Sequence, residues 1–136
     1  MDAPWSEVRL RVRYAETDRM GFAYYGGIAA WLEVGRVEYL RERGLTYREV
    51  EDSGRLLAVR RLKVDYLSPA RYDDVVVVRT RVAGVGKSRL EFESELSCAE
   101  DGRELARARV VLACLDRQGR PQRLGEELNR ACAPGS

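Results

Sequence analysis

The 136-residue sequence contains no histidine, and this absence excludes more chemistry than any single motif does. Without histidine there is no His-dependent catalytic triad and no imidazole general acid or base, and most zinc hydrolase sites are excluded. Any catalysis must therefore rely on carboxylates, backbone dipoles, tyrosine, serine, cysteine or basic side chains. We expect neither a metal site nor a separate cofactor.

Cysteine is also scarce. The chain has three, an odd number without C-x-x-C spacing, so neither a disulfide framework nor a zinc site is predicted. Cys98 and Cys114 lie in strand-like runs and are expected to be small buried core residues. No segment approaches the roughly 20 apolar residues that span a membrane, and the first residues lack the pattern of a signal peptide. We therefore expect a cytoplasmic protein.

The chain also lacks a large excess of either charge, because 24 basic residues and 22 acidic ones leave a net charge of +2. A general nucleic-acid-binding protein would carry basic residues unmatched by acids, so no such partner is expected. Length and a hydrophobic content of 45% suit one domain that buries its own core. Without repeats or linkers, residues 1–136 are predicted to form a single domain.

The hydrophobic pattern predicts one long helix and five strands. From Gly27 to Arg43 apolar residues recur at helical spacing, and Gly44 follows as a C-terminal stop. Thr46 and Glu49 have the spacing of a capping box, which indicates a second, short helix. Strands are expected at 7–14, 57–67, 74–82, 89–98 and 104–115, and a short C-terminal helix is expected at about 122–131.

Two short connections are expected to close hairpins between the last three strands. With a first loop at 84–88, arginines face glutamates across the strands, Arg79 with Glu93 and Arg81 with Glu91. The second hairpin brings Arg107 and Arg109 to the far side of the same acidic stripe. Opposite charges then match across both pairings, as in an antiparallel meander. One helix packed on one antiparallel sheet gives a two-layer α+β domain.

Three motifs follow one another along the chain. The first is Tyr14-x-x-x-Asp18-x-x-Gly21-x-x-Tyr24-Tyr25, which leads into the long helix, and the others lie at 64–74 and 116–121. In this order and spacing they resemble the hotdog-fold acyl-CoA thioesterases of the 4-hydroxybenzoyl-CoA thioesterase-like group, over about residues 8–124. The resemblance implies a hotdog fold, with a long central helix on a five-stranded antiparallel sheet and a short C-terminal helix. Two positions depart from it: Tyr25 is often histidine in that group, and Gly27 is often asparagine.

Thioester hydrolysis needs a nucleophile or activated water and a donor for the negative oxygen that develops. The resemblance implies that Asp18 acts as nucleophile or as general base, and both roles remain open. The oxyanion donor would be the backbone amide of Tyr25 or, as second choice, of Gly26, because the first amides of a helix lack intrahelical partners. Gly21 and Tyr24 would contact the substrate. The alternative is that Asp18 only stabilises a turn.

Lys87, Ser88 and Arg89 follow a glycine in the first hairpin and resemble the group's contact region for the phosphates of CoA, which enters as part of the substrate. Basic side chains and loop amides suit phosphate oxygens. The alternative is a solvated charged hairpin. Glu16 either tunes Asp18 or faces solvent, and it is left out of the catalytic set.

The predicted function is hydrolysis of a small or medium acyl-CoA, aliphatic or aromatic, to the free acid and CoA. An open sheet edge favours pairing with a second copy, and in hotdog relatives two subunits form one continuous sheet. We expect a homodimer at minimum, with a homotetramer as the larger form. Each active site would then consist of Asp18 from one subunit and the helix start or basic hairpin from the other. A dehydratase of the same fold is less favoured, because such enzymes usually rely on histidine and this sequence has none. A non-catalytic acyl-thioester binding or regulatory module is the alternative from another class.

Overall fold

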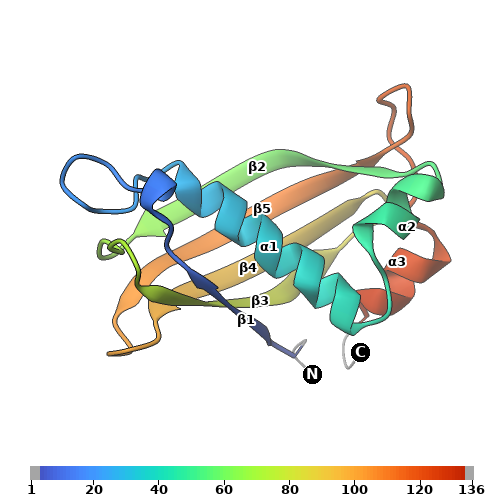
Figure 1. The fold of residues 1–136 in the computed structure, drawn as a ribbon. Helices are drawn as coiled ribbons and strands as arrows, with labels where there is room; N and C mark the ends of the chain where they lie inside the picture. Colours follow the sequence, from blue (N-terminus) through green and yellow to red (C-terminus); the bar gives the residue numbers. More distant parts are fainter. Residues whose placement is uncertain (1–3, 134–136) are drawn as a thin grey trace.

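A five-stranded antiparallel sheet carries one long helix across one face in the computed structural model, which describes residues 4–133 (Figure 1). The strands are β1 (Ser6–Arg11), β2 (Leu56–Tyr66), β3 (Val75–Val85), β4 (Arg89–Cys98) and β5 (Glu104–Leu115), in the spatial order β1-β3-β4-β5-β2. The helices are α1 (Gly27–Glu42), α2 (Tyr47–Asp52) and α3 (Gly125–Ala131), with a 3-10 turn at Tyr14–Glu16. The predicted two-layer fold is confirmed. Residues 1–3 and 134–136 lie outside the described residues. The predictions of a domain over 1–136 and of an N-terminus without a signal peptide fall partly on them.

Helix α1 buries the face that its apolar spacing predicts. Its buried positions include Ile28, Trp31, Leu32, Gly35, Tyr39 and Leu40. A side chain at Gly35 would collide with the side chains of Thr80 and Val78, so this glycine lets the helix approach β3 closely. The predicted capping box of α2 is also present, because Thr46 Oγ1 accepts from the Glu49 amide at 3.2 Å.

The core between helices and sheet divides into two clusters along the length of α1. One gathers Tyr39, Phe92 and Leu128 with residues of α2 and α3, at the end of the sheet where these two helices lie (Figure 1). The other gathers Trp31, Val76 and Leu96 toward the start of α1. Cys98 and Cys114 are buried in these clusters, as predicted. In the part of the chain that the structure describes, no helix is both long and apolar enough to cross a bilayer.

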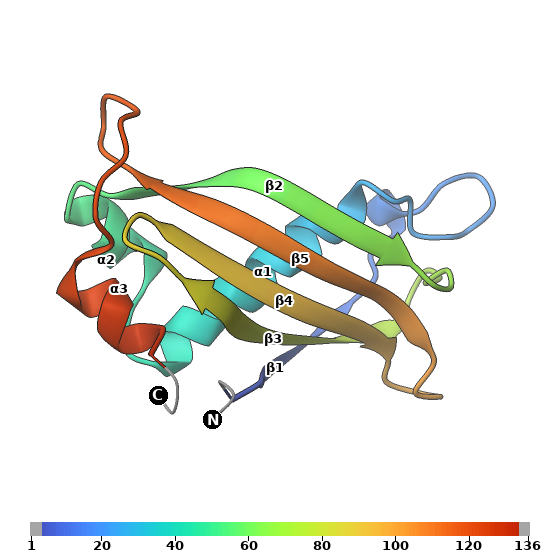
Figure 2. The same ribbon diagram turned by 180° about the vertical axis from the view of Figure 1, so that it is seen from behind.

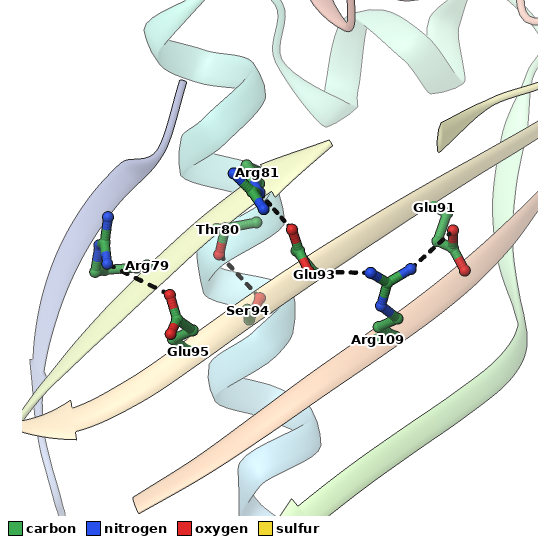
Figure 3. A network of polar contacts seen from close by, with 8 residues as sticks. All are labelled: Arg79, Thr80, Arg81, Glu91, Glu93, Ser94, Glu95 and Arg109. Carbon is green, nitrogen blue, oxygen red and sulfur yellow. Dashed lines mark hydrogen bonds and ion pairs between the residues drawn. The ribbon is translucent and has the colours of Figure 1, made fainter. Parts of the chain in front are cut away.

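The face of the sheet opposite α1 carries charged side chains, and no helix of residues 4–133 covers it (Figure 2). Its arginines and glutamates pair across strands, as Figure 3 shows: Arg79 with Glu95, Arg81 with Glu93, and Arg109 with both Glu91 and Glu93. The prediction that Arg107 and Arg109 lie beside the glutamates of β4 is confirmed, since the register sets them opposite Glu95 and Glu93.

The predicted register of the first hairpin is wrong by two residues. Arg79 lies opposite Glu95 and Arg81 opposite Glu93, instead of Glu93 and Glu91. Strand β3 continues to Val85 rather than ending before Gly84, and a bulge between Val82 and Gly84 adds one residue to it. Because a shift of two keeps every side chain on its own face, the charges still match.

Two predicted boundaries also move. Strand β1 ends at Arg11, and Tyr14 enters the 3-10 turn, where its carbonyl accepts from the amide and the hydroxyl of Thr17 at 3.1 and 2.7 Å. These local bonds turn the chain out of the strand. Helix α3 begins at Gly125 rather than near residue 122, because the Gln122 amide instead bonds to the Cys114 carbonyl at the end of β5, at 2.9 Å.

Candidate functional site

Asp18 opens a tight turn between the 3-10 segment and α1, the loop at one end of the molecule in Figure 1. Its Oδ1 accepts from the amides of Met20 and Phe22 at 2.9 and 3.3 Å, and the Gly21 amide bonds to its carbonyl at 3.0 Å. Gly21 has a φ of +80°, a conformation that favours glycine. Asp18 therefore does stabilise the turn, but it does so with one carboxylate oxygen. Among residues 4–133, nothing bonds to the other oxygen of this exposed side chain.

The turn is fixed to its surroundings by backbone hydrogen bonds. The Ala23 amide bonds to the Ala70 carbonyl at 2.7 Å, and the Tyr24 amide to the Glu16 carbonyl at 3.0 Å. Isolated bridges join Thr17 to Ala23 and Phe22 to Arg71. The loop that carries Asp18 is thus held by both the preceding 3-10 segment and the segment after β2.

Glu16 anchors this loop to α1. Its carboxylate accepts from the Trp31 indole N–H and from the Arg13 amide, each at 2.7 Å. Burial opposes the charged form, yet the hydrogen bonds from Arg13 and Trp31 outweigh it, so the pKa of Glu16 lies below its ordinary value. The alternative that Glu16 faces solvent is wrong, because its side chain is only 12% exposed and links two elements.

The start of α1 offers two backbone donors. The Gly27 amide bonds to the Tyr24 carbonyl at 3.0 Å and the Ile28 amide to the Tyr25 carbonyl at 3.3 Å. In the described part of the chain, the amides of Tyr25 and Gly26 have no acceptor, as expected just ahead of a helix. Gly26 also gives room to a neighbouring ring, because a Cβ there would lie 2.6 Å from Cε2 of Tyr24.

An apolar pocket of about 360 Å³ lies beside this helix start. Three aromatic residues form part of its lining, Tyr25, Trp31 and Tyr66, together with Ile28 and Leu105. The Tyr66 hydroxyl donates to the Tyr25 carbonyl at 3.1 Å, and the two rings meet edge to face at 6.4 Å between centroids. Sequence reasoning missed the part of Trp31 and Tyr66 in this pocket. Two features of the sequence could have indicated it. Trp31 and Tyr66 lie in the first and second motifs, and each is on the apolar side of its helix or strand.

The basic hairpin lies at the other end of the sheet, between β3 and β4 and next to α3 (Figure 2). The Lys87 carbonyl accepts from the Leu124 amide at 3.0 Å and the Ser88 carbonyl from the Cys114 amide at 2.8 Å. Lys87, Ser88 and Arg89 are therefore not brought together with Asp18 within one chain. Among residues 4–133, no three histidine, cysteine, aspartate or glutamate side chains are grouped as a metal site.

Comparisons with known proteins agree with this architecture. The family model described as "Thioesterase-like superfamily" matches residues 12–132. The acyl-CoA thioester hydrolase YbgC of Escherichia coli is 30% identical over 79% of this chain and 79% of its own length. The putative acyl-CoA thioesterase YneP of Bacillus subtilis is 37% identical over 55% of this chain. This match covers 54% of YneP, about half of its length. Among solved structures, the DHNA-CoA thioesterase of Staphylococcus aureus has a TM-score of 0.85 and 32% identity, covering 88% of this chain and 80% of that one. The chain belongs to the thioesterase-like superfamily and is a thioester hydrolase of the hotdog fold.

Proposed function

We propose that the protein hydrolyses acyl-CoA thioesters to the free acid and CoA. One observation carries the proposal: a carboxylate with an uncommitted oxygen lies in the turn that leads directly to two unpaired amides at a helix start. An attacking group and a donor for the developing oxyanion are what acyl transfer from a thiolate leaving group requires. The acyl-CoA thioesterase names of the relatives support this substrate class.

Asp18 acts on the thioester carbonyl in one of two ways. As general base it takes a proton from water, which attacks the carbonyl carbon; the C–S bond breaks, CoA leaves as thiolate, and the proton passes from Asp18 to solvent or the thiolate. As nucleophile its free oxygen attacks directly, CoA leaves as thiolate, and water hydrolyses the resulting mixed anhydride. In both routes negative charge gathers on the carbonyl oxygen, where the Tyr25 or Gly26 amide stabilises it with the partial positive charge of the helix start.

The acyl group occupies the apolar pocket beside α1. A pocket of about 360 Å³ lined by Tyr25, Trp31 and Tyr66 accommodates a small or medium acyl chain or one aromatic ring. Gly21 and Tyr24 flank the turn through which the thioester reaches Asp18. Edge-to-face contacts with the aromatic lining favour a planar acyl group over a branched one.

A second copy of the chain completes the site. Strand β2 is a sheet edge of 11 residues, and its apolar side chains Val59, Leu62 and Tyr66 are exposed, with Val59 55% exposed. Long apolar edges favour pairing with another strand. Antiparallel pairing of two β2 strands about a two-fold axis sets the Asp18 end of one subunit beside the hairpin end of its partner. Lys87, Ser88 and Arg89 of the partner subunit then bind CoA phosphates.

A panel of acyl-CoA esters, aliphatic and aromatic, with detection of the released thiol tests the proposal. We expect catalytic release of CoA from at least one class, with saturation kinetics. Binding of the esters without CoA release would contradict hydrolysis and support an acyl-thioester binding module instead. The mass of the protein in solution tests the dimer separately, since a monomer at working concentration would overturn the shared site.

A further inference from the structure

The hydroxyl of Tyr66 makes a contact that the proposed chemistry has not yet used. Tyr66 is the last residue of β2, and its backbone is paired with Ala106 of β5. The chain just beyond it is also fixed, because the Leu67 amide bonds to the Leu105 carbonyl at 2.9 Å and Ser68 Oγ to the Glu104 carbonyl at 2.6 Å. The phenol therefore extends from a strand end that the sheet holds in place.

This phenol bonds to the backbone of the turn that precedes α1. In the described part of the chain, Tyr66 is the only side chain that bonds to the main chain of residues 24–27. Its partner, the Tyr25 carbonyl, accepts a second bond from the Ile28 amide at a longer 3.3 Å. Both bonds lie at the long end of the range for their types, and the bond from Tyr66 at 3.1 Å is the one that ties this carbonyl to the sheet.

The consequence follows from the geometry of the peptide unit. A trans peptide is planar, with its C=O and N–H pointing in opposite directions, so fixing the Tyr25 carbonyl also fixes the Gly26 amide. Because the carbonyl points toward the amide of Ile28 inside the helix, the Gly26 N–H points out of the N-terminal end of α1. The preceding peptide is held in the same way, since the Tyr24 carbonyl accepts from the Gly27 amide at 3.0 Å.

We propose that Tyr66 is a positioning residue for the oxyanion site: its hydroxyl holds the Tyr25–Gly26 peptide so that the unpaired helix-start amides keep the direction needed to meet the developing charge. This inference rests on the proposed thioesterase function. Donors that stabilise a transition state contribute most when they are oriented before the reaction begins. Loss of the hydroxyl is therefore expected to slow turnover without weakening substrate binding.

The test is Tyr66→Phe, which removes one oxygen and keeps the ring that lines the pocket. We expect kcat to fall by about 3- to 10-fold, the range that one neutral hydrogen bond represents, because this residue does not itself touch the oxyanion. The Kd for a non-hydrolysable acyl-CoA thioether should stay within about 2-fold of wild type, and the melting temperature should fall by no more than about 5 °C, the shift that one lost hydrogen bond causes. Tyr72→Phe is the matched control, since Tyr72 is similarly exposed, at 55% against 52%, and its hydroxyl has no bond in the described structure.

A second readout does not depend on catalysis. In ¹⁵N-resolved NMR spectra, Tyr66→Phe should shift the Gly26 amide resonance and speed its hydrogen exchange, whereas Tyr72→Phe should change neither. An active wild type with unchanged kcat in Tyr66→Phe would overturn the inference about Tyr66 alone, and so would an unchanged Gly26 resonance. A wild type that releases no CoA from any ester would contradict the proposed function and, with it, a catalytic purpose for Tyr66.

Discussion

The seven tyrosines divide between the two ends of the sheet, and the division separates two kinds of structure. At the end with α2 and α3, Tyr39 and Tyr47 pack into the core, and burial raises the pKa of both phenols. At the end with the Asp18 turn, five tyrosines are exposed: Tyr14, Tyr24, Tyr25, Tyr66 and Tyr72. One end uses its aromatic surface to stabilise the fold, and the other keeps it accessible.

The hairpin at one end and the turn at the other also differ in their hydrogen bonds. In the hairpin at the α3 end, the Lys87 carbonyl accepts from the Leu124 amide and the Ser88 carbonyl from the Cys114 amide of β5. At the other end, the amides of Tyr25 and Gly26 and one oxygen of Asp18 have no partner among residues 4–133. Because Asp18, Tyr25 and Gly26 are all exposed, these donors and this acceptor are available to a substrate.

The largest expected effect is at the accessible end. Asp18→Asn keeps an oxygen that can accept from the Met20 and Phe22 amides but removes the charge that takes a proton or attacks carbon. We expect kcat to fall by at least about 100-fold, in the range typical of a lost general base, with little change in melting temperature. Initial rates of thiol release on the best ester of the panel, with thermal melts, measure both.

Asp73→Asn is the matched control for this prediction. Asp73 lies near the same end, and its side chain is also exposed, at 63%. Its φ of 71° is tolerated by asparagine, and its pair with Arg11 is a surface one. This variant should keep the wild-type rate. A wild-type rate in Asp18→Asn would exclude the catalytic role and leave Asp18 as a turn residue only.

At the packed end, the prediction is reversed. Phe92 is fully buried and meets Tyr39 edge to face at 5.6 Å between ring centroids. Phe92→Ala should lower the free energy of unfolding by about 3–5 kcal/mol, while the kcat of the protein that remains folded changes little. Tyr14→Ala, at the accessible end, should cost about 0.5 kcal/mol or less, since Tyr14 is 79% exposed. Urea unfolding measures both, and equal losses would remove the contrast between the ends.

The sequence predicted local features well, because they depend on neighbours along the chain. Helical spacing identified the buried face of α1, including Trp31 and Tyr39, and the turn role given as the alternative for Asp18 is present, while its catalytic role stays a prediction. The register of β3 against β4 was missed because the turn closes at Lys87 and Ser88 and not over 84–88, and the alternation of residues marks neither this turn nor the bulge near Gly84. The bonds from Trp31 to Glu16 and from Tyr66 to Tyr25 join residues 15 and 41 positions apart, and only the folded chain brings them together.

The hairpin tests whether the two ends meet across a pair of subunits. Replacing Lys87 and Arg89 with alanine should raise KM for acyl-CoA by about 3- to 10-fold, leave kcat nearly unchanged and weaken the dependence of KM on salt, because charge-assisted phosphate contacts are lost. Arg9→Ala with Arg48→Ala removes the same charge from positions without an ion pair in the described structure and should change neither constant. Unchanged KM in the hairpin variant would remove this end from the site.

The smallest expected effect concerns Glu16, a partly buried carboxylate at the accessible end. Because its pKa is lowered on folding, its charged form stabilises the protein above the pKa of the unfolded chain, and this contribution is lost as pH falls through the folded pKa. Glu16→Gln should therefore cost about 1 kcal/mol of unfolding free energy at pH 7, and the difference from wild type should shrink steadily as the solution is acidified.

Glu126→Gln is the matched control, since Glu126 is 86% exposed and pairs with Arg130 on the surface of α3. Its stability should follow wild type within about 0.5 kcal/mol at every pH. A pH-independent loss in Glu16→Gln would mean that the carboxylate acts by shape and hydrogen bonding alone. Since Glu16 joins the Asp18 loop to Trp31 of α1, a loss that follows its ionisation would show that its charge helps to fix this loop to the helix.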